Sequence, residues 1–104
     1  MIAADPPCLA TAQSTADLDA CVGRALTAQQ RLLHTVYARA LRSGGGDRAQ
    51  LVRSQQRWLA FRAADCAYAE SRYRGGTIAP VQRALCLLRD TADRVAALRV
   101  YLTR

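Results

Sequence analysis

The chain has 104 residues, enough for a single domain with one hydrophobic core. It carries 15 basic residues, all of them arginine, against 8 acidic ones, for a net charge of +7, but the arginines are spread along the chain and form no block. This spread favours solvated helix faces, or attraction to an acidic protein or envelope polymer, over binding to nucleic acid. No run of about 18 apolar residues is present, which excludes a membrane-spanning helix.

The first residues lack the features of a signal peptide, because neither a basic segment nor an apolar stretch follows Met1. Small residues followed by Pro6 and Pro7 are typical of the start of a mature exported protein. We therefore expect that a signal peptide was removed and replaced by Met1, and that residues 1–13 form a leader ahead of the first helix.

Three helices are predicted from the pattern of apolar residues and glycines. Two glycine clusters, Gly44–Gly46 and Gly75–Gly76, separate three segments in which apolar residues recur at three- and four-residue steps. The predicted helices span about residues 14–42, 47–73 and 78–103.

Residues that start helices stand at the expected boundaries. Ser14 with Asp17 is a start signal for the first helix, Asp47 is a good N-cap for the second, and Pro80 is tolerated in the first turn of the third. No segment alternates with period two, so no sheet is expected. The predicted fold is all-α, a three-helix antiparallel bundle in one domain, residues 1–104.

The second segment carries a spaced apolar stripe, formed by Leu51, Val52, Trp58, Leu59, Phe61, Cys66 and Tyr68. Some arginines have an acidic residue four positions away, a spacing that favours ion pairs within a helix. The predicted pairs are Glu70–Arg74, Arg89–Asp93 and Asp90–Arg94.

The chain contains four cysteines, an even number without any Cys-x-x-Cys pair. This favours two disulfides over reduced buried thiols, and both over a metal or redox site. In a hairpin turning at Gly75–Gly76, Cys66 and Cys86 lie level, and a Cys8–Cys21 bond would tie the leader to the first helix. In the chain-entropy model, closing each of these loops contributes about 3 kcal/mol to the free energy of unfolding.

The segment 51–66 contains the pattern Gln-x-x-Trp-x-x-x-Arg-x-x-x-Cys, followed by a Gly-Gly pair and a further cysteine. Together these features resemble the lysozyme inhibitor LprI-like family over nearly the whole chain. The residues that match the family motifs, for which the resemblance implies a structural role, are Tyr37, Gln55, Trp58, Arg62, Thr91 and Arg94. The first helix departs from the family, which usually has an acidic residue and a Leu-Asn pair where this chain has Arg31-Leu32-Leu33-His34.

The resemblance implies a bacterial, exported, disulfide-containing helical domain. Some relatives inhibit lysozyme and some protect against wall-degrading toxins.

Two interpretations are open for the row formed by Gln55, Trp58 and Arg62. In the favoured one, Trp58 fills the core while the two polar residues hydrogen-bond to the third helix, with Thr91, Asp90 or Asp65 as candidate partners. In the other, the row lines a binding groove.

No catalytic group is expected. His34 is the only histidine, and no Ser, Cys or carboxylate lies near it on its helix to complete a nucleophile and base pair. With the cysteines assigned to disulfides, no nucleophilic thiol remains. We therefore expect a protein that is not an enzyme and that needs no cofactor or metal.

The turn between the second and third helices places an aromatic residue between two arginines, and these residue types are favoured at protein interfaces. The candidate partner-binding residues are Arg72, Tyr73, Arg74 and Thr77. The leading hypothesis is a periplasmic or secreted inhibitor, or immunity protein, that blocks the cleft of a lysozyme-like or other peptidoglycan hydrolase, including a secreted toxin. The positive charge favours an acidic or neutral enzyme. The alternative is an envelope adaptor that binds an anionic polymer or a protein through its arginine-rich faces.

Overall fold

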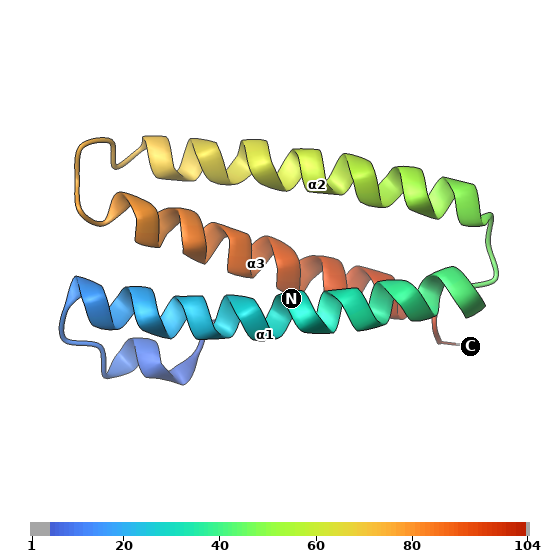
Figure 1. Cartoon of the computed structure of the whole chain (residues 1–104), viewed down its shortest axis with the longest axis horizontal. Helices are drawn as coiled ribbons and strands as arrows, with labels where there is room; N and C mark the ends of the chain where they lie inside the picture. Colours follow the sequence, from blue (N-terminus) through green and yellow to red (C-terminus); the bar gives the residue numbers. More distant parts are fainter. Residues whose placement is uncertain (1–4, 104) are drawn as a thin grey trace.

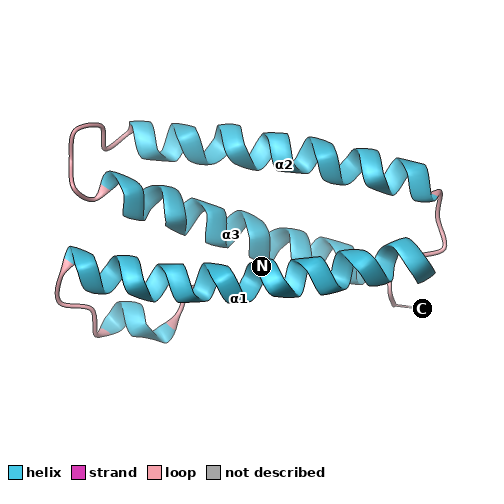
Figure 2. Ribbon diagram, viewed as in Figure 1, coloured by secondary structure: helices cyan, strands magenta, loops and turns pink. Residues whose placement is uncertain are grey.

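The computed structural model describes residues 5–103 and contains only helices and turns over that range. A 3₁₀-helix, η1 (Pro7–Ala10), precedes three α-helices: α1 (Thr15–Ser43), α2 (Arg48–Ser71) and α3 (Ala79–Val100) (Figure 1, Figure 2). The predicted all-α, three-helix fold is confirmed. The first part of the expected leader, residues 1–4, lies outside the described residues.

Local capping explains where the first two long helices begin. The Ser14 hydroxyl accepts a hydrogen bond from the Asp17 amide at 3.0 Å, and the Asp47 carboxylate accepts one from the Ala49 amide at 2.9 Å. Each satisfies an amide that has no partner within its own helix. Helix α3 begins without a side-chain cap but has a proline in its first turn.

Helix α2 ends at Ser71, short of the expected residue 73. The Tyr73 amide donates to the Glu70 carbonyl at 3.0 Å, a bond across three residues that tightens the chain into a turn. Helix α3 likewise ends at Val100, short of the expected residue 103. Arg72 and Tyr73, which were expected to end the second helix, therefore belong to the turn that follows α2.

Helix α3 packs against both other helices, whereas α1 and α2 make few contacts with each other. Figure 1 shows α3 running in the same direction as α1, with α2 antiparallel to both. The molecule is elongated, 45 × 25 × 20 Å. None of the helices in the described range has the length and hydrophobicity that a membrane crossing requires.

The core consists of two apolar clusters along the α1–α3 interface. Near the start of both helices, Val22 packs with Val81 and Leu88, and Leu9 of η1 covers this cluster. The second cluster lies nearer the ends of the same helices and contains Leu33, Val36, Val95 and Leu98, with Tyr37, Leu51, Trp58 and Leu102 packed against it.

The apolar residues of the second segment do not form one buried stripe. Only Gln55 and Cys66 of α2 are buried, while Leu59 is 44 %, Phe61 57 % and Tyr68 67 % exposed. The reason is the helix arrangement: α2 meets α3 along one side and hardly touches α1, so a helix with apolar residues on several sides must leave some in water.

Both predicted disulfides are confirmed. Cys8–Cys21 ties η1 to α1, with the two Cα atoms 5.9 Å apart, and Cys66–Cys86 joins α2 to α3, with a Cα separation of 5.3 Å. Each bond is local, because it links elements that are consecutive in the chain.

Candidate functional site

The turn from Arg72 to Thr77, here called the tip, connects α2 to α3 at one end of the molecule. The side chains of the predicted partner-binding residues Arg72, Tyr73, Arg74 and Thr77 are all exposed there. Tyr73 is the least exposed of the large apolar residues on the surface, at 37 %. The tip therefore presents two guanidiniums and one aromatic ring together.

The tip is a folded turn held by its own backbone. The Arg74 amide donates to the Ser71 carbonyl at 3.3 Å, and the Gly76 amide donates to the Tyr73 carbonyl at 2.9 Å. Gly75 has a φ of 84°, in the left-handed region that favours glycine. The Gly-Gly pair thus sets the shape of the turn that displays the tip side chains.

The arginines of the tip are not neutralised by neighbouring carboxylates. The Arg72 guanidinium carbon lies 5.9 Å from the centre of the Tyr73 ring, a cation–π distance. The only ion pair within residues 5–103 joins Arg89 to Asp5 at 3.2 Å.

The three ion pairs predicted within helices are therefore wrong. Arg89 reaches Asp5 instead of Asp93, and Arg94 binds uncharged groups of α2 instead of Asp90. In the remaining predicted pair, Glu70–Arg74, Arg74 lies beyond the end of α2, so the helical spacing is lost.

The family-motif residues meet at the α2–α3 interface, where two arginines flank Trp58. The guanidinium carbon of Arg62 lies 4.8 Å from the centre of the indole ring and that of Arg94 lies 5.9 Å from it. Arg62 donates to the Thr91 hydroxyl at 2.9 Å, and that hydroxyl donates to the Leu87 carbonyl at 2.6 Å. Trp58 itself is half-buried against the second core cluster.

Arg94 completes the same network from α3. Its Nε donates to the Gln55 side-chain oxygen at 2.9 Å and its Nη2 donates to the Ser54 hydroxyl at 3.1 Å. Burial lowers the pKa of both Arg62 and Arg94 from the ordinary value of an arginine, although such groups stay protonated at neutral pH. Tyr37, the remaining motif residue, packs from α1 against the second core cluster.

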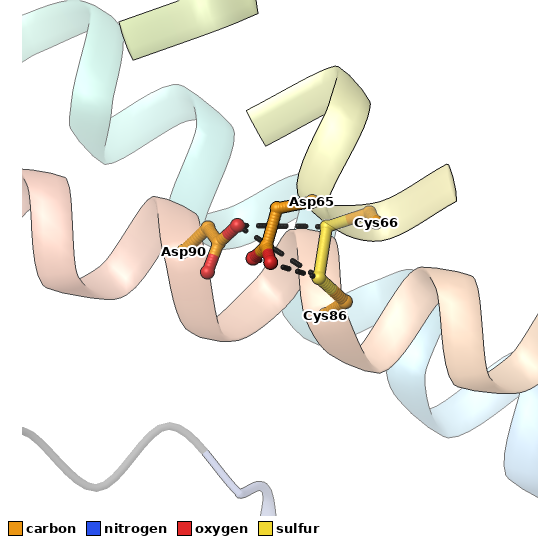
Figure 3. A group of neighbouring side chains, drawn as sticks. All are labelled: Asp65, Cys66, Cys86 and Asp90. Atoms are coloured by element: carbon orange, nitrogen blue, oxygen red, sulfur yellow. Dashed lines mark hydrogen bonds between the residues drawn. A yellow bond between two sulfur atoms is a disulfide. The ribbon is translucent and has the colours of Figure 1, made fainter. Parts of the chain in front are cut away.

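A carboxyl pair lies beside the Cys66–Cys86 disulfide, and sequence reasoning did not identify it. The Asp65 Oδ2 atom is 3.4 Å from the Cys86 sulfur, and the Asp90 Oδ2 atom is 3.6 Å from the Cys66 sulfur (Figure 3). Burial raises the pKa of Asp90 to about 7, and the hydrogen bond and negative charge of Asp65 add to the rise. Because disulfide sulfurs carry no hydrogen, a protonated carboxyl is the group that can donate in these contacts.

The ligand atoms of Asp65, Cys66, Cys86 and Asp90 lie within 4.8 Å of one another, a spacing that a metal ion could use. Sulfur binds metals as thiolate. With both sulfurs joined to each other, the donor set is reduced to two carboxyl groups. The cluster therefore offers a metal ion only two carboxyl groups of the protein.

His34 is exposed on α1, at a shallow depression whose other lining residues are Thr27, Gln30, Arg31 and Thr35. Neither a carboxylate nor a Ser or Cys side chain is among them. A larger cavity of about 610 Å³ lies at the α1–α2 turn, between the glycines 44–46 and Tyr101. Sequence analysis identified those glycines only as a helix stop.

Two comparisons with known proteins gave no match: neither the curated proteins nor the solved structures include one that is significantly similar to this chain. The scan of protein-family models did give a match. The model described as "Lysozyme inhibitor LprI" covers residues 8–98, which include the tip, the Trp58 network and both disulfides. The chain therefore belongs to the lysozyme inhibitor LprI family.

Proposed function

We propose that this protein is a periplasmic or secreted inhibitor of a peptidoglycan-degrading enzyme, and that it acts by placing its tip in the cleft of that enzyme. The observation that carries the proposal is the exposed Arg72-Tyr73-Arg74 segment at the end of a disulfide-linked hairpin. Membership of a family named for lysozyme inhibition supports the choice of target.

The chemistry of the tip complements that of a glycoside hydrolase cleft. Such a cleft contains a pair of carboxyl groups that flank the bond to be cleaved. Arg72 and Arg74 supply positive charge to meet them, and the Tyr73 ring supplies apolar contact area. Because the turn is held by backbone hydrogen bonds, little conformational freedom is lost when it binds.

The disulfides support the proposed compartment. Disulfides persist in oxidising spaces such as the bacterial periplasm or the cell exterior, and these are the spaces in which wall-degrading enzymes act. A target secreted by a competing bacterium would make this protein an immunity protein, and a host lysozyme would make it a defence factor. In both roles the protein inhibits a wall hydrolase by binding to it.

The test is an assay of cell-wall lysis. The oxidised protein is mixed with a panel of peptidoglycan hydrolases, and the loss of turbidity of a wall suspension is followed. We expect inhibition of at least one enzyme at a stoichiometric ratio, with a complex visible on a sizing column. A double variant, Tyr73→Ala with Arg74→Ala, should weaken inhibition by at least about tenfold, as expected for loss of interface anchors.

A matched control is Arg99→Ala with Tyr101→Ala, which removes an exposed arginine and an exposed tyrosine near the end of α3. It should inhibit as well as the unmodified protein. Full lysis by every enzyme in the presence of excess protein would contradict the proposed function. Inhibition that the tip variant retains would contradict the assignment of the tip.

The second candidate function, an envelope adaptor, is favoured by one observation: of the many exposed arginines, only Arg89 forms an ion pair within the described range. An adaptor would bind an anionic wall polymer strongly at low salt and weakly at moderate salt, because exposed charges are screened. Such binding without any effect on lysis would select this function over inhibition.

A further inference from the structure

The side of α2 that faces away from α3 carries an uncharged, partly aromatic surface. We call it the α2 outer face, and define it by six exposed residues: Ala60, Phe61, Ala63, Ala64, Ala67 and Tyr68. Phe61 and Tyr68 are separated by two helical turns, so their rings project from the same side. Their side chains are 57 % and 67 % exposed, so two large aromatic rings lie in water. The opposite side of α2 packs against α3.

Arginines flank this surface at both ends. Arg53 and Arg57 precede it on α2, and Arg72 and Arg74 of the tip follow it, all exposed. The two acidic residues between them, Asp65 and Glu70, are only half-exposed, and Asp65 lies against the Cys66–Cys86 disulfide. From Arg57 to Arg72 the helix rise gives a length of about 22 Å.

The charges decide which partner fits. A second copy of this protein would bring two +7 molecules together with arginines at both ends of each apolar surface, so repulsion opposes self-association. A complementary partner has an apolar patch with carboxylates on both sides of it. Because α2 leads directly into the tip, the two surfaces can contact the same partner molecule.

We propose that the α2 outer face is a second contact surface for the inhibited hydrolase, and that it rests on an acidic, partly apolar rim beside the cleft that the tip enters. This inference depends on the proposed function and adds specificity to it. The contact selects acidic peptidoglycan hydrolases over basic ones, because a basic rim would face Arg53 and Arg57.

The test uses a double variant, Phe61→Ser with Tyr68→Ser. Both side chains are exposed, so the variant should unfold at the same temperature as the unmodified protein. We expect its Kd for an acidic hydrolase that the unmodified protein inhibits to rise by at least about tenfold. The control is Val100→Ser with Tyr101→Ser, which removes two other exposed apolar side chains, one aliphatic and one aromatic, and should change the Kd less than twofold.

A second variant tests the charges. Arg53→Gln with Arg57→Gln should reduce the salt dependence of binding and reduce the preference for an acidic over a basic hydrolase. An unchanged Kd for the Phe61/Tyr68 variant, while the unmodified protein still inhibits, would overturn this inference and leave the proposed function standing. Equal inhibition of acidic and basic enzymes by the unmodified protein would overturn the proposed selectivity. Absence of inhibition of any hydrolase would remove the proposed function and this inference with it.

Discussion

The two interfaces of α3 are built differently. Against α1, α3 buries aliphatic side chains in two clusters that run the length of both helices. Against α2, it makes a disulfide, the Trp58 network and polar bonds through Arg62 and Arg94, and only Gln55 and Cys66 of α2 are buried. The α1 interface depends mainly on removal of apolar surface from water, whereas the α2 interface adds directional and covalent contacts to the packing of Leu51 and Trp58.

This difference explains how α2 can expose aromatic side chains without loss of the fold. Hydrophobic burial stabilises in proportion to the apolar area removed from water, so a helix held that way must turn its apolar side inward. Helix α2 is attached on one side only, by a disulfide, by hydrogen bonds and by the packing of Leu51 and Trp58, so the residues on its other side are free to face solvent. Its outer face is therefore available for a partner.

The largest expected effect is a cavity at the α1–α3 interface. Leu98 is fully buried, and Leu98→Ala should lower the free energy of unfolding by about 3–4 kcal/mol, from lost transfer energy and the cavity left behind. Urea denaturation measures the change. Leu59→Ala on α2 is the control and should cost less than about 0.5 kcal/mol, because Leu59 is exposed. Equal losses would contradict the conclusion that burial of Leu98 stabilises the α1–α3 interface.

Removal of the covalent link should destabilise α2. The variant Cys66→Ala with Cys86→Ala should lose about 3 kcal/mol of unfolding free energy, since the unfolded chain regains the freedom of the opened loop. Trp58 fluorescence and circular dichroism during urea denaturation measure it. The control variant, Cys8→Ala with Cys21→Ala, removes the other disulfide. It should leave the fluorescence of Trp58 in the folded protein unchanged, because that bond joins only η1 to α1.

The Trp58 network should contribute less than the disulfide. Arg62→Met retains an unbranched apolar chain but loses the bond to Thr91 and the cation–π contact, so we expect a loss of about 1–2 kcal/mol. The control, Arg53→Met, changes an exposed arginine on the same helix and should be nearly neutral. A loss as large for Arg53→Met as for Arg62→Met would show that the network adds no stability of its own.

A further expected effect is a dependence of stability on pH. The folded protein holds a proton on Asp90 up to about pH 7, whereas an unfolded chain releases it near the ordinary pKa of 3.8. Between these values the folded state binds more protons, so stability should fall as pH rises from about 4 to about 7.

The Asp90→Asn variant should flatten this fall, with Arg62, Asp65 and Asp93, the charged groups that act on Asp90, left in place. Thermal unfolding across that pH range measures the slope. If the stability of the Asp90→Asn variant falls with pH as steeply as that of the unmodified protein, groups other than Asp90 cause the pH dependence.

The sequence predicted the helices, their capping residues and both disulfides, because each depends on residues close together or on a hairpin whose turn is marked by glycines. It also predicted that Gln55 and Arg62 would reach the third helix, with Thr91 among the candidate partners, and the structure places Arg62 on Thr91. The exposure of Phe61 and Tyr68 was not predictable from their spacing, since it depends on which helices pack together.

The carboxyl pair beside the disulfide was missed for the same reason. Asp65 and Asp90 come together only when α2 and α3 are paired in register. The ion-pair predictions failed because Arg94 and Arg89 have partners that are distant in sequence. Local sequence patterns predict where helices begin and end, whereas contacts between side chains of different helices can be identified only from the packed structure.

The local character of the two disulfides has a consequence for a cut chain. Gly45 and Gly46 are exposed in the turn between α1 and α2, the kind of place where proteases cleave. After a cut there, one fragment retains Cys8–Cys21 and the other retains Cys66–Cys86, so no covalent bond joins them. The two pieces would remain together through non-covalent contacts only, chiefly the aliphatic α1–α3 interface, and urea without any reductant would be enough to separate them. Fragments that end and begin at the α1–α2 turn, produced separately, should therefore bind each other and restore the fold.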